Sequence, residues 1–366
     1  MMNDTLAPNP PKKRLLSLDV LRGITIAGMI LVNNGGGPMP YSPLTHAEWN
    51  GLTLADLVFP FFLFMVGIST YISLRKFQFQ WSVPLARKIL KRTCLILLIG
   101  WGIYWFEGCC KKDFLPFDHL RIPGVLQRIA VCYGIVSLLA VTVKHKWLPW
   151  LAGLLLVIYT FILLFGNGYA CDNTNIVAIV DQRIFGMAHL YHKSPIDPEG
   201  LLGVIPSIAH TLIGFWIGKT LMEHQGLKDK MLHLFLIGFA LLAIGLLFTY
   251  GLPFNKRIWS PTFVLFTCGA ASCLQAWLIH DIDDKGYRKW TPFFESFGVN
   301  PLFLYVFSEL LAIVFSDFGI TKFLYNHIHA IISDPHIASL TYALLFVTFN
   351  WLVGYVLYKK RIYIKL

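Results

Sequence analysis

The sequence is short of charged residues. Only 14% of the 366 residues are Asp, Glu, Lys or Arg, whereas 56% are hydrophobic, and the mean hydropathy is +0.60. A soluble domain carries about 25% charged residues, so this composition excludes that class and indicates an integral membrane protein. The net charge of +11 would suit a nucleic-acid-binding protein, but the basic residues lie in short clusters between apolar runs. That distribution is typical of a multi-pass membrane protein instead.

Motifs for metals, phosphates and repeats are also missing. The seven cysteines show no metal-ligand spacing, and four of them lie inside apolar runs, so we interpret them as packing residues. The sequence has no Gly-rich phosphate loop and no internal repeat of the kind found in transporters built from two matched halves. The longest segment between apolar runs is 167–200, which is too short for a separate domain.

The apolar runs predict an all-α bundle of about ten transmembrane helices, since a span needs about 20 apolar residues. The run at 15–34 follows three basic residues like a signal peptide, but it contains Asp19 and Arg22 and lacks a cleavage site, so we expect a retained helix. We therefore divide the chain into a cytoplasmic tail, 1–14, and a single transmembrane domain, 15–366. The expected spans are 15–34, 54–74, 88–106, 123–143, 147–166, 201–221, 231–250, 261–280, 296–315 and 337–358.

The basic residues also predict the orientation of the bundle. If the N-terminus is cytoplasmic, 21 of the 31 Lys and Arg residues fall on the cytoplasmic side, as the positive-inside rule requires. Both termini are then cytoplasmic, and the loop that contains His46 faces outward. For a bacterial protein this membrane is the inner one, and the outward loops lie in the periplasm.

Polar residues are concentrated just before the second expected span. The stretch "THAEWNGLTLADLVF" places His46, Trp49 and Asn50 before the span and Asp56 in its first turn. A histidine beside a carboxylate is a working general base, although an Asp in a first turn also stabilises the helix dipole. Trp49 suits either stacking on a sugar or anchoring the helix at the membrane interface.

The first expected span carries two charges and ends in amides and glycines. Asp19 and Arg22 lie three residues apart on one helical side, which is close enough to pair. Such a pair either fixes helix packing or takes part in substrate binding. Asn33 is followed closely by Gly35–Gly37, which either make a sharp turn or direct backbone N–H groups at an oxygen anion.

Charged and amide residues recur at the outer ends of other expected spans, in "DHLRIPGVLQRIAV", "IDPEGLLG" and "FNKRIWS". Polar side chains beside apolar surface predict a binding site inside the bundle that is open to the outer face. The candidate residues are Arg121, Gln127, Arg128, Asp197, Glu199, Asn255, Lys256, Trp259 and, in the ninth span, Asn300.

Several of these motifs occur in a fixed order: "SLDVLRG", "VNNGGG", "HAEWNGLTLADLVFPFFLFMVG", "LRIPGVLQRIAV", "DPEGLLG", "FNKRIWS" and "GVNPL". Together they resemble the transmembrane domain of the heparan-α-glucosaminide N-acetyltransferase family, which includes a lysosomal enzyme and bacterial relatives. The resemblance covers the chain from about Leu18 to the basic C-terminus. It implies transfer of an acetyl group from cytosolic acetyl-CoA to the amine of a terminal glucosamine across the membrane. It also implies that His46 is catalytic and that the protein is a homodimer.

The sequence departs from the family in three places. We expect no counterpart here of the large N-terminal luminal domain and first helix of the lysosomal enzyme, and therefore ten spans where that enzyme has eleven. The loop between Asn33 and His46 is slightly longer than in the family. A family histidine of the ninth span is replaced near Val306–Ser308.

The residues support the implied chemistry. We expect His46 to remove the amine proton, with Asp56 or a neighbouring carboxylate orienting it, while Asn33, Asn50 or the Gly35–Gly37 amides receive the oxyanion. A covalent acetyl-His46 intermediate is the competing mechanism. Donor phosphates have candidate partners on the cytoplasmic side, where positive-inside topology alone also predicts basic residues. These candidates are Arg75, Lys76, Arg87, Lys88 and Arg92.

Two other functions fit the same features. The first is a sugar or acyl-donor transporter without chemistry, and the second is O-acetylation of a cell-envelope glycan.

Overall fold

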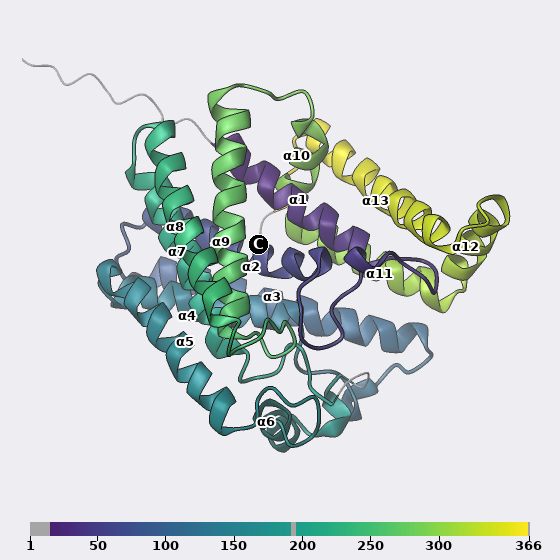
Figure 1. Ribbon diagram of the computed structural model, residues 1–366. Helices are drawn as coiled ribbons and strands as arrows, with labels where there is room; N and C mark the ends of the chain where they lie inside the picture. Colours follow the sequence, from purple (N-terminus) through teal and green to yellow (C-terminus); the bar gives the residue numbers. More distant parts are fainter. Residues whose placement is uncertain (1–14, 192–194, 365–366) are drawn as a thin grey trace, which may run out of the picture.

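The computed structural model describes residues 15–191 and 195–364. The expected cytoplasmic tail, 1–14, lies outside the described residues. Helices form nearly all of the regular structure, and no strand occurs within the described ranges (Figure 1). The α-helices are α1 (Leu16–Asn33), α2 (Leu54–Arg75), α3 (Val83–Cys110), α4 (Val125–Thr142), α5 (Leu148–Phe165), α6 (Ile176–Phe185), α7 (Val204–Glu223), α8 (Leu227–Phe248), α9 (Pro261–Leu278), α10 (Thr291–Val299), α11 (Pro301–Asp317), α12 (Ile320–Ile331) and α13 (Pro335–Lys359).

The membrane spans agree with the sequence prediction except at the ninth. Within the described residues, 9 helices are long and apolar enough to cross a membrane, and α10 with α11 makes up to 10 if this bent pair is one span. The expected span at 296–315 is not one straight helix, because the chain bends by 86° between α10 and α11. Pro301 has no N–H to continue the helical hydrogen bonds, and Asn300 before it leaves the helical region at φ −125° and ψ 55°.

The middle of the bundle is formed by α1, α2, α7 and α9, whereas α3 and α8 lie at the periphery with few of their residues buried. The sequence of α2, which includes "FPFFLFMVG", is apolar on every face, as expected for a helix surrounded by other helices. Glycines let α2 and α7 approach closely. A Cβ added to Gly67 would lie 2.2 Å from the carbonyl oxygen of Thr211, and one added to Gly214 would lie 2.3 Å from that of Phe64.

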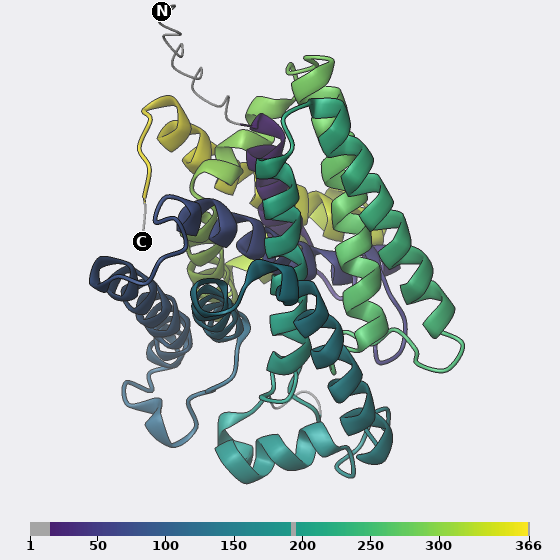
Figure 2. The same ribbon diagram turned by 90° about the vertical axis from the view of Figure 1, so that its left-hand side faces the viewer.

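The two ends of the bundle differ in what they bring together. At one end, the start of α1 contacts the chain that follows α9, where the Leu16 backbone N–H donates to the Asp283 carboxylate at 3.1 Å. The C-terminal segment joins them there, because Asn300 donates to the Ile362 carbonyl oxygen at 2.8 Å. The short helix α6 lies at the opposite end (Figure 2). We call the end with Leu16, Asp283 and Ile362 the basic end, and the end with α6 the cavity end.

Candidate active site

His46 and Asp56 form a hydrogen-bonded pair at the start of α2. Nδ1 of His46 lies 2.9 Å from Oδ1 of Asp56, whose side chain is fully buried, while the His46 side chain is 45% exposed. The other Asp56 oxygen accepts hydrogen bonds from the backbone N–H groups of Ala47 and Thr53, both at 3.1 Å. Asp56 therefore caps α2 and orients the histidine, so both sequence interpretations of this residue apply. With Nδ1–H directed at the carboxylate, Nε2 is left as the basic nitrogen.

Lys256 completes this cluster from the loop before α9. Its Nζ lies 2.9 Å from His46 Nδ1, 3.3 Å from His46 Nε2 and 3.4 Å from Asp56 Oδ1. Burial lowers the pKa of Lys256, and the Asp56 carboxylate opposes that effect. Lys256 therefore belongs to the same cluster of polar side chains as His46 and Asp56.

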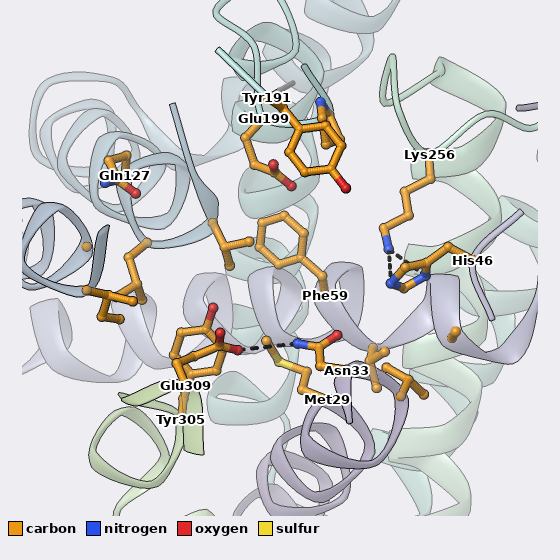
Figure 3. Close-up of a pocket in the computed structure, with 18 of the residues that line it drawn as sticks. Met29, Asn33, His46, Phe59, Gln127, Tyr191, Glu199, Lys256, Tyr305 and Glu309 are labelled. Carbon is orange, nitrogen blue, oxygen red and sulfur yellow. Dashed lines mark hydrogen bonds between the residues drawn. The ribbon is translucent and has the colours of Figure 1, made fainter. Parts of the chain in front are cut away.

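His46 and Lys256 line a cavity of about 580 Å³ at the cavity end (Figure 3). Apolar side chains such as Met29 and Phe59 line part of its wall, and polar groups project into it from several elements. In Figure 3, Gln127 lies far from His46 and Lys256 across the cavity. The polar lining residues are Asn33, His46, Tyr104, Arg121, Gln127, Tyr191, Glu199, Lys256, Arg257, Tyr305 and Glu309. Among the described residues, no group of His, Cys, Asp or Glu is arranged to hold a metal ion.

Arg121 fastens the loop before α7 to the wall of this cavity. Its guanidinium contacts Asp197 at 2.7 and 3.2 Å and Glu199 at 2.6 Å. It also lies over the rings of Tyr104 and Tyr191, at 5.7 and 4.9 Å. Burial would lower the pKa of Arg121, but Glu199 and Asp197 outweigh it and raise the pKa. Arg121 is thus a permanent cation whose charge is matched inside the protein.

Glu309 of α11 lies on another part of the cavity wall. Its Oε1 accepts a hydrogen bond from Nδ2 of Asn33 at 3.3 Å, and Tyr305 lies beside it.

The glycines Gly35–Gly37 follow the end of α1, where the sequence predicted either a sharp turn or a site for an oxygen anion. Gly36 has φ +69° and the Gly37 N–H donates to the Gly35 carbonyl oxygen at 2.8 Å, so the turn is confirmed. None of these three glycines lines the cavity.

The structure brings six of the predicted site residues to the cavity wall and places others directly behind it. Asn255 donates to Asn50 at 3.1 Å, which ties the loop of Lys256 to the loop of His46. The Trp49 indole N–H donates to the Tyr169 carbonyl oxygen at 2.9 Å, so this ring is held by a neighbouring loop. The six wall residues are Asn33, His46, Arg121, Gln127, Glu199 and Lys256.

Other predicted site residues lie away from the cavity. Arg128 is buried, with its guanidinium 5.1 Å from the Trp259 ring. The predicted Asp19–Arg22 pair is confirmed at 3.3 Å, and Arg22 also donates to the Gly298 carbonyl oxygen, between α1 and α10. Asn300 holds the C-terminal segment at the basic end. Asp19, Arg22, Arg128, Trp259 and Asn300 do not line the cavity, and their predicted part in substrate binding stays a prediction.

The residues predicted to hold donor phosphates are divided. Three of the five line a groove of about 390 Å³ in the first turns of α3, together with Lys91, which the prediction omitted. No carboxylate forms an ion pair with these four cations in the described part of the chain. Arg75 donates to the Met222 carbonyl oxygen at 3.5 Å, and neither Arg75 nor Lys76 lines the groove. The groove cations are Arg87, Lys88, Lys91 and Arg92.

Sequence reasoning did not select four polar residues of the wall besides Arg257. Glu309 carried a usable signal, because a carboxylate in the middle of an apolar run is costly and usually has a function. The tyrosines carried none, since tyrosine is common in membrane helices and at their interfaces. The four residues are Tyr104, Tyr191, Tyr305 and Glu309.

Comparison with known proteins agrees with the sequence resemblance. A family model described as heparan-alpha-glucosaminide N-acetyltransferase, catalytic, matches residues 14–250. The chain belongs to this family. Two relatives of this N-acetyltransferase family carry the name heparan-alpha-glucosaminide N-acetyltransferase. The human protein is 30% identical over 423 residues, covering 99% of this chain and 61% of its own length. The mouse protein is 30% identical over 412 residues, covering 96% and 60%. The chain thus spans about three fifths of each relative.

Proposed function

We propose that this protein is a transmembrane N-acetyltransferase that moves an acetyl group from cytosolic acetyl-CoA to the amine of a terminal glucosamine on the outer side of the membrane. The observation that carries the proposal is the buried Asp56 carboxylate holding His46 on the wall of a cavity of about 580 Å³. Membership of the N-acetyltransferase family and the apolar helices support the same reaction class.

The reaction needs a base at the nitrogen that attacks. The acceptor nitrogen starts as an ammonium and loses two protons: one exposes its lone pair, and one leaves when the C–N bond forms. The C–S bond of the thioester breaks, the thiolate sulfur takes up one proton, and one proton goes to solvent. His46 Nε2 is the group proposed to take the proton from the attacking nitrogen and deliver it to the sulfur, with Asp56 stabilising the charged ring. Base catalysis of this kind contributes roughly 10²- to 10⁴-fold to a rate.

The oxyanion of the tetrahedral intermediate needs hydrogen-bond donors. Of the candidates predicted from the sequence, Asn33 is the one that lines the cavity, so we assign it this role. Asn50 bonds to Asn255 instead. One N–H of the Asn33 amide faces Glu309, and the amide has a second to offer the oxyanion.

The donor enters from the basic end in this account, which we place in the cytosol. The α3 groove would hold the CoA phosphates through Arg87, Lys88 and Arg92. Along α3, Arg92 of the groove and Gly100 of the cavity wall are eight residues apart, or about 12 Å at 1.5 Å per residue. The pantetheine arm would follow this stretch of helix. In a bacterium the acceptor side would be the periplasm, and we expect a homodimer.

Isotope exchange and product formation test this mechanism against three alternatives: the acetyl-His46 intermediate, a transporter and an O-acetyltransferase. Purified wild-type protein is given acetyl-CoA and labelled CoA, with and without glucosamine. Direct transfer predicts N-acetylglucosamine when acceptor is present and no labelled acetyl-CoA without it, whereas an acetyl-His46 intermediate predicts labelled acetyl-CoA even without acceptor. A transporter makes no N-acetylglucosamine in either case, and an O-acetyltransferase acetylates N-acetylglucosamine as readily as glucosamine.

A further inference from the structure

Glu309 is a carboxylate on the cavity wall for which the described ranges, 15–191 and 195–364, contain no cationic partner. Its one side-chain hydrogen bond to a neighbouring helix comes from the Asn33 amide, at 3.3 Å. No Lys or Arg of the described residues forms an ion pair with it. Two of the cations that line the cavity are paired with other carboxylates, since Arg121 contacts Asp197 and Glu199, and Lys256 contacts Asp56.

The surroundings of Glu309 increase the need for a positive ligand. The ionisable groups that act on it are Tyr305 of α11 and Tyr104 and Glu107 of α3, and none of them is a cation. Glu107 is itself paired with Lys111 at 2.5 Å on the exposed part of α3. A carboxylate inside a helical bundle is costly unless a cation or a proton neutralises it. The cavity is the place from which such a partner can arrive.

We propose that Glu309 binds the ammonium group of the acceptor and takes the first of the two protons that its nitrogen must lose. The inference rests on the proposed function in that the acceptor is an amine. In the balanced step, R–NH3⁺ and the carboxylate become R–NH2 and the carboxylic acid, which returns its proton to water through the open cavity. His46 then receives the second proton during attack. Asn33, which contacts Glu309, lies between the two groups in Figure 3.

This arrangement also makes the site bind the substrate more tightly than the product. Glucosamine carries a positive charge, whereas N-acetylglucosamine is a neutral amide. The ion pair with Glu309 is therefore present before the reaction and absent after it, which favours release of the product. A hydroxyl acceptor of the same shape gains nothing from Glu309, so the site selects the chemical class of protonated amines.

The test compares wild type with Glu309→Gln, which keeps the shape and can still accept the Asn33 hydrogen bond. We expect KM for glucosamine to rise about tenfold to a hundredfold, as for the loss of a charged hydrogen bond, with KM for acetyl-CoA unchanged. The difference in KM for glucosamine between Glu309→Gln and wild type should shrink as the pH rises through the pKa of the acceptor's own ammonium, because the solution then supplies neutral amine. Glu309→Asp should retain the wild-type pH profile. The matched control is Glu223→Gln, whose side chain is 56% exposed at the end of α7 and does not line the cavity; it should leave every constant near wild type.

A binding measurement makes the result independent of chemistry. Without acetyl-CoA, glucosamine should raise the Tm of the wild type more than N-acetylglucosamine does, and Glu309→Gln should abolish the difference. An unchanged KM and an unchanged preference in Glu309→Gln would overturn the proposal. If the wild type transfers no acetyl group to any amine while the charge preference still depends on Glu309, the ammonium site stands and the proposed function fails. If Glu309→Gln does not fold, Glu309→Asp decides. A wild-type KM and pH profile in Glu309→Asp supports the site, whereas equal Tm shifts with glucosamine and N-acetylglucosamine contradict it.

Discussion

Asp56→Asn removes a single negative charge beside His46 and leaves the shape of the helix start intact. The amide oxygen can still accept the Ala47 and Thr53 backbone hydrogen bonds that the carboxylate now accepts at 3.1 Å. The amide nitrogen then faces His46 Nδ1, so it donates to that nitrogen and drives the ring proton to Nε2. His46 would lose its basic nitrogen toward the substrate. We expect kcat for acetyl transfer to fall by about 10²- to 10⁴-fold, with KM for both substrates changed little.

A neighbouring variant separates catalysis from capping. Thr53→Ala removes the hydroxyl that donates to Asp56 at 3.0 Å but leaves the His46–Asp56 contact in place. It should cost about 0.5–2 kcal/mol of stability as a lost helix cap, and kcat should stay within a few-fold of wild type. Steady-state kinetics and thermal unfolding in detergent measure both quantities. If Asp56→Asn folds and retains wild-type kcat, the proposed role of the pair is refuted.

Two further predictions concern stability. Burial raises the pKa of Asp181 in α6 from 3.8 to about 6. Between about pH 4 and 6 the folded protein therefore keeps a proton on Asp181 that the unfolded chain loses, so the free energy of unfolding declines as the pH rises through this range. Asp181→Asn keeps the acceptor for the Leu201 N–H and should remove this decline, with a gain of about 1–3 kcal/mol at pH 7; a Tm that falls over the same pH range in both proteins would contradict it. Gly67→Ala should lower Tm by several degrees, because its Cβ would lie 2.2 Å from backbone of α7. Gly102→Ala, on open helix surface, should leave Tm unchanged or slightly raised, and equal effects at both glycines would refute the close-packing explanation.

The sequence predicted the features that depend on local pattern. Nine of the ten expected spans are continuous helices because long apolar runs have few alternatives in a bilayer. The pairing of His46 with Asp56 was also predictable, since ten residues separate them and Asp56 must lie in a first helical turn. The ninth span shows the limit of counting apolar residues. Pro301 occupies an apolar run, yet it ends one helix and starts another at 86°.

Features that depend on the arrangement of distant helices were not predictable. Lys256 is 210 residues from His46, and nothing in either motif indicates that Nζ lies 2.9 Å from the imidazole. The sequence also placed Asn300 with the binding residues because it is an amide inside an apolar run. Its contacts with Ile362 and Ile364 depend on where the C-terminal segment folds. The contact between Asn33 and Glu309 likewise needs α1 and α11 to be neighbours.

The most direct measurement is transfer of labelled acetyl from acetyl-CoA to free glucosamine by purified protein in detergent, with wild type and His46→Ala side by side. The Thr53→Ala variant serves as a folded control with an altered helix start and an intact histidine. The account predicts labelled N-acetylglucosamine from wild type and Thr53→Ala, and a loss of about 10²-fold or more from His46→Ala. Equal product from a folded His46→Ala, or no product from a wild type that binds both substrates, would contradict it.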